Sequence, residues 1–220
     1  MRGIDVSSNQ HPGSKPIDWE AVADAGYGFV IVKATQGLTY VNPWAVRDIE
    51  DAFAAGLFVG AYHYFEVGDD PAAQAKNFIS ALIGQRLDMG TWLDWEPGEL
   101  PAWSIATQLD GFLNEARGAR PGIGVYCDRS WQETFRAQNV TVGRLWLADW
   151  GQRQPDGAIL WQNATGQPVE GVPAPVDTDV LVSERSFNLA SYPPPRPGTV
   201  ALAHVPAREP AVPPAGEDGP

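Results

Sequence analysis

The feature that most constrains the fold of this chain is a regular alternation of strand-like apolar runs with helix-like segments. The first five strand-like runs start roughly 26 to 34 residues apart, the length of a strand followed by a crossover helix. The last three follow at roughly 14 to 23 residues, which leaves no room for full helices. The runs begin near Gly3, Phe29, Leu57, Thr91, Gly122, Leu145, Ile159 and Val176.

The segments between the early runs carry helix start and stop signals. Asp18 is an N-cap candidate for a helix that stops at Gly26, and further helices are predicted over 43–55, 71–83 and 104–117. A repeated strand and helix favours a parallel sheet, and about eight strands in one domain favour closure into a barrel. We therefore predict an α/β fold, an irregular TIM-like (β/α)5(β)3 barrel with five β/α units followed by three strands.

Composition divides the chain into two parts. Residues 1–191 carry the predicted barrel, and 44% hydrophobic content with nine Trp is ample for its core. From residue 192 to 220 the sequence becomes rich in Pro and Ala and loses apolar periodicity, which is typical of a flexible tail or linker.

Charge and targeting signals narrow the class of protein. A net charge of −12 without a basic stripe argues against nucleic acid as a partner. No apolar run has the length of a signal peptide or a membrane span, so we expect synthesis in a bacterial cytoplasm and no membrane insertion. If the target is a cell wall, release then depends on another factor. We also expect a monomer without a cofactor.

The sharpest chemical signal is the run from Thr91 to Pro97, where an apolar strand gives way to Asp94 and Glu96. Reacting groups of a β/α barrel lie where strands end, and two residues along a strand place both carboxyl groups on one face. Buried carboxyl groups this close repel, so one keeps its proton at neutral pH. Hydrolysis of a glycoside needs such an acid together with a second negative group.

Further acids occur at other strand positions. Asp5 lies within the first strand, where a core role is hard to explain, although a turn or cap is the alternative. Asp177 lies near the last strand, with Asp179 as its competitor. Cys127 beside Tyr126 is better read as a small buried residue than as a nucleophile.

Ordered motifs across the predicted barrel resemble glycoside hydrolase family 25, the Chalaropsis-type lysozymes found among bacteria and phage endolysins. The intervening Trp95 departs from the small aliphatic residue common in the family, and we expect its side chain to pack away from the cleft. Asp179 replaces a frequent Asn. The matching motifs are GIDVSSNQ at 3–10, FVIVKATQG at 29–37, VGAYHYF at 59–65, LDWEP at 93–97, LWLADW at 145–150, LWQ at 160–162 and VDTDVL at 176–181.

The resemblance implies cleavage of the β-1,4 bond between N-acetylmuramic acid and N-acetylglucosamine in bacterial peptidoglycan. Glu96 would be the general acid, and Asp94 would orient or stabilise the 2-acetamido group of the substrate. Asp5 and Asp177 would complete the acidic site. Attack by that acetamido group is favoured over direct attack by water.

Side chains near other strand ends fit the recognition of sugars. Tyrosines and tryptophan offer faces for stacking, while amide and carboxylate groups bond to hydroxyls. His63 alternates with two of the tyrosines, so it faces the helices if they face the cleft. The predicted substrate-binding residues are Tyr62, Tyr64, Tyr126, Asp149, Trp161 and Gln162.

Two other functions fit parts of the pattern. Four acids are compatible with Mg²⁺ or Ca²⁺, as in a metal-dependent phosphodiesterase, but that enzyme needs cations for phosphate and the strand ends offer mainly Lys33. A lysozyme-like barrel that binds peptidoglycan without cutting it is the second alternative. The full set of acids argues against this second alternative, and the scarcity of cations argues against the first, so we expect catalysis without a bound metal.

Overall fold

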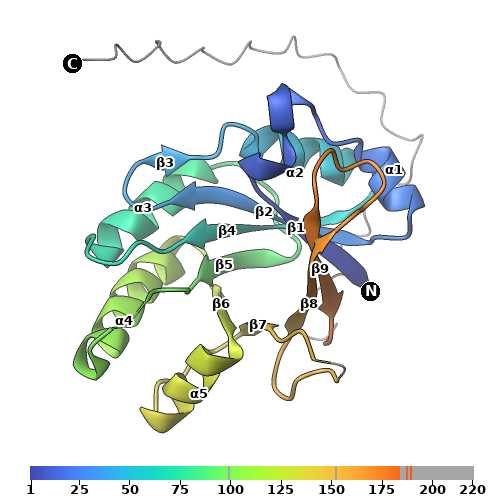
Figure 1. Ribbon diagram of the computed structural model, residues 1–220. Coiled ribbons are helices and arrows are strands. Elements are labelled where there is room, and N and C mark those ends of the chain that lie inside the picture. Colours follow the sequence, from blue (N-terminus) through green and yellow to red (C-terminus); the bar gives the residue numbers. More distant parts are fainter. Residues whose placement is uncertain (99, 152, 184–186, 188, 190–220) are drawn as a thin grey trace, which may run out of the picture.

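The computed structural model describes residues 1–98, 100–151, 153–183, 187 and 189. Nine strands form one sheet in the order β1-β9-β8-β7-β6-β5-β4-β2-β3, and β1 also pairs with β2, which closes eight of them into a barrel (Figure 1). The strands are β1 (Arg2–Val6), β2 (Phe29–Gln36), β3 (Tyr40–Val41), β4 (Phe58–Tyr64), β5 (Gly90–Asp94), β6 (Gly124–Asp128), β7 (Leu145–Ala148), β8 (Leu160–Gln167) and β9 (Val176–Leu181).

Each of the first five barrel strands leads into an α-helix, which confirms the predicted irregular barrel. Asp18 caps the first helix by accepting a hydrogen bond from the backbone N–H of Ala21. The fifth helix was expected, but its residues were not located from the sequence. The helices are α1 (Trp19–Asp24), α2 (Ala45–Ala54), α3 (Pro71–Ala81), α4 (Ala102–Ala119) and α5 (Arg129–Ala137).

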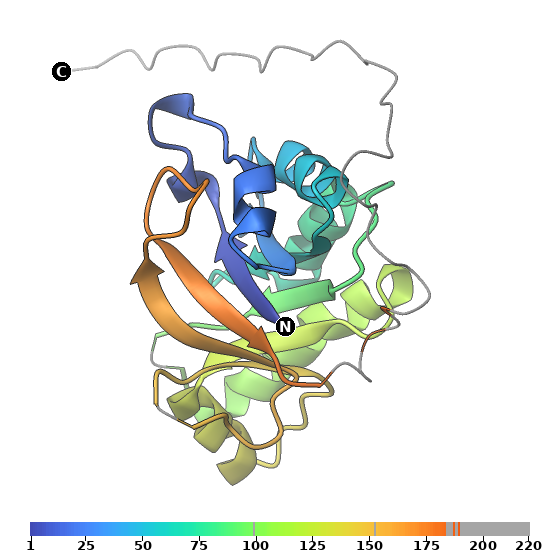
Figure 2. The ribbon, with the colours of Figure 1, turned by 90° about the vertical axis from the view of Figure 1, so that its right-hand side faces the viewer.

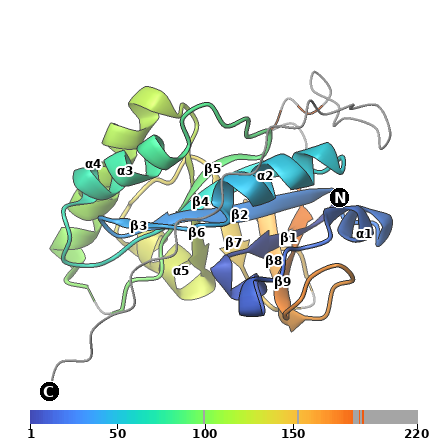
Figure 3. The ribbon, with the colours of Figure 1, turned by 90° about the horizontal axis from the view of Figure 1, so that it is seen from above.

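The last part of the barrel lacks this helical layer. Figure 2 shows β8 and β9 on a side of the barrel that no helix covers, whereas the view in Figure 3 shows α2, α3 and α4 beside the parallel strands. The sheet also departs from the parallel arrangement that the sequence favoured, because β9 runs antiparallel to both β1 and β8. The short connection between β8 and β9 turns back directly, and a hairpin is antiparallel by construction.

Alternation along the strands builds two cores. Phe29 and Ile31 of β2 point into the barrel, while Val30 and Val32 point outward into the layer beneath the helices. Gly3 of β1 faces the inner layer, and a Cβ atom there would lie 2.3 Å from the Phe29 ring. A glycine at this position lets the inner aromatic ring fill the barrel floor.

The same alternation orients the residues beside the predicted acids. Trp95, next to Asp94, is fully buried on the outer side, where its ring lies 5.0 Å from that of Phe65 and 5.8 Å from that of Trp131. His63 also faces outward and packs against Phe78 of α3 at 5.7 Å between ring centroids. Both orientations were predicted from the strand period.

The predicted division at residue 191 falls at the edge of the structure. Residues 1–183 contain the barrel and its helices. The proposed tail over 192–220 lies outside the described residues, so this division stays a prediction.

Candidate active site

Four carboxyl groups meet in one pocket at the end of the barrel where the parallel strands finish. Asp5 lies in β1, Asp94 is the last residue of β5, and Glu96 follows two residues later. Asp177 lies near the start of β9, directly opposite Asp5 in the strand register. Because β9 is antiparallel to β1, its beginning lies at this same end of the barrel. All four side chains line the pocket.

Most of the predicted sugar-binding residues line the same pocket. They come from three different strands and surround the acids: Tyr62 and Tyr64 of β4, Tyr126 of β6 and Gln162 of β8. The two tyrosines of β4 share a face because they are two positions apart.

Asp149 directly follows β7 and Trp161 is the second residue of β8, and neither is among the residues that line this pocket. The Asp149 carboxylate pairs with Arg129, and the hydrogen bond from that guanidinium lowers the pKa of Asp149. The Trp161 indole N–H donates to the backbone oxygen of Asp149 at 2.6 Å. The contact between Trp161 and Asp149 joins β8 to the end of β7, so both residues stabilise the barrel beside the pocket.

Four residues without an assigned role also line the pocket: Ser7, Asn9, Lys33 and Trp146. Trp146 faces inward from β7, which the strand period alone could have indicated. Ser7 and Asn9 follow β1 in a loop, where no period applies. The Lys33 ammonium donates to Gln36 and lies 4.6 Å from the centre of the Tyr64 ring, so a single cation is held among the lining acids.

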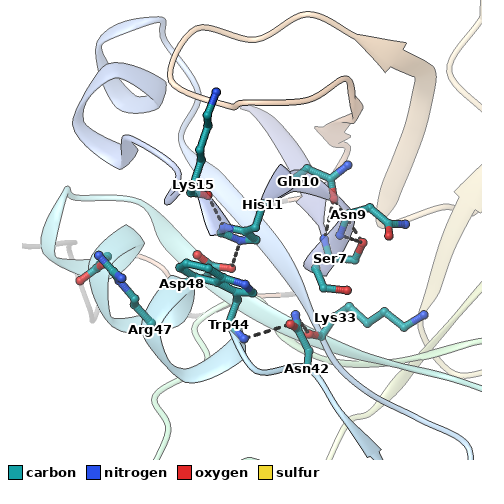
Figure 4. A network of polar contacts seen from close by, with 12 residues as sticks. Ser7, Asn9, Gln10, His11, Lys15, Lys33, Asn42, Trp44, Arg47 and Asp48 are labelled. Carbon is teal, nitrogen blue, oxygen red and sulfur yellow. Dashed lines mark hydrogen bonds and ion pairs between the residues drawn. The ribbon is translucent and has the colours of Figure 1, made fainter. Parts of the chain in front are cut away.

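Figure 4 shows how the loop that carries Ser7 and Asn9 is fixed. Buried His11 places one ring nitrogen 2.9 Å from the Lys15 carbonyl oxygen and the other 2.9 Å from Asp48 of α2. The same ring stacks on Trp44, with 4.0 Å between centroids and 2° between planes. These contacts tie the loop after β1 to the start of α2.

A capping interaction within the loop sets its local conformation. The Ser7 side chain accepts from the backbone of Asn9, and the Gln10 side chain accepts from the backbone N–H of Ser7 at 2.8 Å. Gln10 also donates to the backbone oxygen of Pro175, which precedes β9. The loop is therefore joined to the strand that carries Asp177.

Burial and mutual repulsion raise the pKa values of three acids of the pocket, Asp5, Asp94 and Glu96. Desolvation, and then the charge of Glu96, raise the pKa of Asp94 well above its ordinary value. Desolvation also raises the pKa of Glu96. Burial and the opposing Asp177 raise the pKa of Asp5 to about 7. A pocket of this kind supplies a carboxylic acid at neutral pH, which general acid catalysis requires.

The structure separates Asp177 from Asp179. Asp177 lines the pocket and accepts a hydrogen bond from the backbone N–H of Gly166 at 2.8 Å. Asp179 is only 1% exposed and accepts from the indole of Trp146 at 2.7 Å, beneath the pocket. Of the two competing acids, Asp177 is the one placed to meet a ligand.

A hydrogen-bond chain connects the acids across the pocket floor. The Tyr126 hydroxyl donates to Gln162 Oε1 at 3.0 Å, and Gln162 Nε2 donates to Asp5 Oδ2 at 3.0 Å. The Tyr126 hydroxyl also interacts with Glu96, and this contact lowers the pKa of Glu96 against the larger, opposite effect of desolvation.

Other candidate chemistries receive less support. Burial raises the pKa of the Cys127 thiol to about 12, so this side chain is a protonated core residue at neutral pH. Within the described part of the chain, no group of three or more His, Cys, Asp or Glu side chains is arranged to hold a metal ion. No helix among the described residues is long and apolar enough to cross a membrane.

Known proteins resemble this chain in sequence and in fold. A protein named YegX from Escherichia coli K12 is 31% identical over 194 residues, which cover 82% of this chain and 69% of YegX. Lysozyme M1 of Streptomyces globisporus is 30% identical over 200 residues, covering 80% of this chain and 66% of that enzyme. The crystal structure of a bacterial lysozyme from Streptomyces coelicolor superposes with a TM-score of 0.66 at 25% identity, over 83% of this chain and 92% of that one.

The match to a family model covers most of the barrel. Residues 4–172 match the model of glycosyl hydrolases family 25, a range that includes Asp5, Asp94 and Glu96 but ends before Asp177. The barrel topology, the acids that meet in one pocket and this match all point to the same family. The chain belongs to glycosyl hydrolases family 25 and is a glycosidase.

Proposed function

We propose that this glycosidase is an endo-acting N-acetylmuramidase that hydrolyses the β-1,4 bond between N-acetylmuramic acid and N-acetylglucosamine in bacterial peptidoglycan. Relatives named as lysozymes and as N,O-diacetylmuramidase support peptidoglycan as the substrate. The observation that carries the proposal is the convergence of Asp94 and Glu96, two positions apart, in a pocket with Asp5 and Asp177. The half-buried Tyr64 lies where this pocket opens to solvent, and an open pocket suits a polymer chain.

In this mechanism Glu96 is the general acid. Its proton passes to the glycosidic oxygen as the bond from that oxygen to C1 of the muramic residue breaks. Asp94 accepts the N–H of the 2-acetamido group and orients its carbonyl oxygen, which attacks C1 to form an oxazolinium. Water then adds to C1, gives its proton to the Glu96 carboxylate and releases the acetamido group.

Two features of the pocket support this division of roles. Desolvation raises the pKa of Glu96 above its ordinary value, as a resting general acid requires. Asp94 is buried, and its Oδ1 atom has no hydrogen-bond partner among the described residues. An N–H group of the substrate would satisfy that atom.

The decisive experiment compares Glu96→Gln with the matched control Glu20→Gln, an exposed residue of α1. Digested cell walls are assayed for new reducing ends, and wall binding is measured by co-sedimentation. We expect Glu96→Gln to lose turnover by at least about a thousandfold while it still binds walls, and Glu20→Gln to behave as wild type. Unchanged turnover of Glu96→Gln would refute the assignment.

Product analysis tests the bond and the attacking group. Mass spectrometry should find N-acetylmuramic acid at the reducing ends, whereas reducing N-acetylglucosamine would indicate a glucosaminidase. Early NMR spectra should show retention of the β-anomer, because attack by the acetamido group and then by water inverts C1 twice. Initial formation of the α-anomer would instead indicate direct attack by water.

The same assays separate the alternatives. A binding module without activity would sediment with walls but release no reducing ends in its wild-type form. A metal-dependent phosphodiesterase would lose activity in a chelator, and Lys33 is the single cation among the residues that line the pocket. Synthesis in a bacterial cytoplasm and a monomeric state stay predictions, to be tested by fractionation of the source cell and by sedimentation. From the resemblance to phage endolysins and the lack of a signal-peptide-like run we also predict a phage-type endolysin, and efficient export of the chain from a bacterium would contradict this.

A further inference from the structure

Asp179 is a carboxyl group enclosed in the barrel beneath the pocket. It lies in β9 opposite Gly3 of β1 and Gln162 of β8, and it is 1% exposed. It shares a face of β9 with Asp177, two positions away, but unlike that residue it does not line the pocket.

The two oxygen atoms of Asp179 have different surroundings. Oδ1 accepts a hydrogen bond of 2.7 Å from the Trp146 indole. Oδ2 has no hydrogen-bond donor among the described residues, and the carboxyl group of Asp5, two positions from Gly3 on the neighbouring strand β1, interacts with that of Asp179. Carboxylates only accept, so a hydrogen bond between these two acids forms only when one of them keeps a proton.

The groups that face Asp179 from the surrounding strands favour that proton. Asp5 on β1 and Asp177 on β9 are acids, and Tyr126 on β6 is a weak acid, while Trp146 on β7 and Gln162 on β8 are neutral. No cation is found among the described groups that act on Asp179. Burial and the charge of Asp5 raise the pKa of Asp179 well above its ordinary value.

Asp179 contacts two parts of the pocket at once. Through Trp146 it orients a ring that packs edge-to-face on Tyr126, with 4.7 Å between centroids. Through Asp5 it meets the chain that continues to Gln162, Tyr126 and Glu96. A change at Asp179 is thus transmitted both to the floor of the pocket and to the proposed acid.

We propose that Asp179 is a positioning residue that keeps a proton in the active enzyme and donates it to Asp5 while accepting from Trp146. This inference rests on the proposed muramidase function. An Asn at this position would supply the same donor from Nδ2 and the same acceptor from Oδ1, but it would not titrate. The carboxyl group therefore gives the enzyme an alkaline limit, because loss of its proton breaks the bond to Asp5 and sets two buried charges against each other.

The first test is the pH profile of kcat/KM on purified peptidoglycan for wild type, Asp179→Asn and Asp179→Ala. The matched control is Asp110→Asn, an exposed residue of α4. We expect Asp179→Asn to retain activity at pH 5 and to remain active at least about one pH unit further into the alkaline range. Asp179→Ala should lose about tenfold or more at every pH. An alkaline limb of Asp179→Asn that coincides with wild type would overturn the proposal.

The second test detects the proton on Asp179 from the pH dependence of stability, without an activity assay. Since folding raises the pKa of Asp179, the folded wild type loses stability as pH rises from about 4 towards the folded pKa, and Asp179→Asn is free of this loss. Urea midpoints should favour Asp179→Asn increasingly as pH rises. A stability difference that does not change with pH would refute the claim that Asp179 keeps a proton. Wild-type protein that is inactive on peptidoglycan would instead refute the proposed function, and the stability test would still apply.

Discussion

His63 offers a quantitative test of how the outer core is built. Its ring is fully buried on the outer side of β4. Nδ1 lies 2.7 Å from the Thr35 hydroxyl, and Nε2 lies 3.2 Å from Gln74 Oε1. The Gln74 amide is itself oriented, because its oxygen accepts from the backbone of Glu66 and its nitrogen donates to the Glu66 carbonyl.

These contacts assign the tautomer of the ring. Gln74 Oε1 can only accept, so Nε2 carries the hydrogen and Nδ1 accepts from Thr35. A second proton would charge a ring enclosed between Phe78 and Phe112. Burial accordingly lowers the pKa of His63 from 6.5 to about 4.

The sign and size of the pH effect follow. The folded pKa lies below the unfolded one, so the contribution of neutral His63 to stability is present above pH 6.5 and is lost as pH falls towards 4. The drop in pKa corresponds to about 3 kcal/mol of the free energy of unfolding. In His63→Asn the amide oxygen can still accept from Thr35, and the side chain does not titrate.

We expect His63→Asn to be less stable than wild type by about 2 kcal/mol at pH 7, since ring contacts and one hydrogen bond are lost. Wild type loses about 3 kcal/mol by pH 4, where the contribution of the neutral ring is gone, so the difference should reverse and leave His63→Asn about 1 kcal/mol more stable there. Urea unfolding at pH 4, 5, 6 and 7 measures it. Phe135→Leu, a core change on α5, should cost about 1 kcal/mol at every pH. A difference for His63→Asn that stays constant with pH would refute the reasoning.

Three further predictions concern the barrel interior and the pocket. Gly3→Ala should lower stability by about 1 to 3 kcal/mol in urea unfolding, because the new Cβ atom would lie 2.3 Å from the Phe29 ring; Gly143→Ala, with open space around it, should be nearly neutral. Asp5→Asn should abolish activity yet become more stable than wild type as pH rises from 4 to 7, since folding raises the pKa of Asp5 from 3.8 to about 7; equal stability at pH 8 would contradict this. Wild-type kcat/KM should fall above neutral pH, when Glu96 in the pocket and Asp179 beneath it, whose pKa values are both raised, lose their protons; a rate that still rises at pH 9 would contradict the role of Glu96.

The sequence determined the architecture because the signals for it are local. The spacing of apolar runs gave eight strand starts, each within two residues of a barrel strand in the structure. Strand period placed Asp94 and Glu96 on one side and Trp95 and His63 on the other. The helix α5 was not located, because it begins at Arg129 directly after β6 and offers no Gly or Pro as a boundary.

Tertiary structure decided which of these residues meet. Asp5 and Asp177 are far apart in the chain, and they face each other only because β9 enters antiparallel beside β1 and closes the barrel. That direction also separates Asp177 from Asp179, since Asp177 lines the pocket near the start of β9, whereas Asp179, two positions further along the strand, is enclosed in the barrel. The pair Asp94 and Glu96 was visible in the sequence because both belong to one strand end, whereas the hydrogen bonds that join Tyr126, Gln162 and Asp5 link three strands and depend on three-dimensional closure.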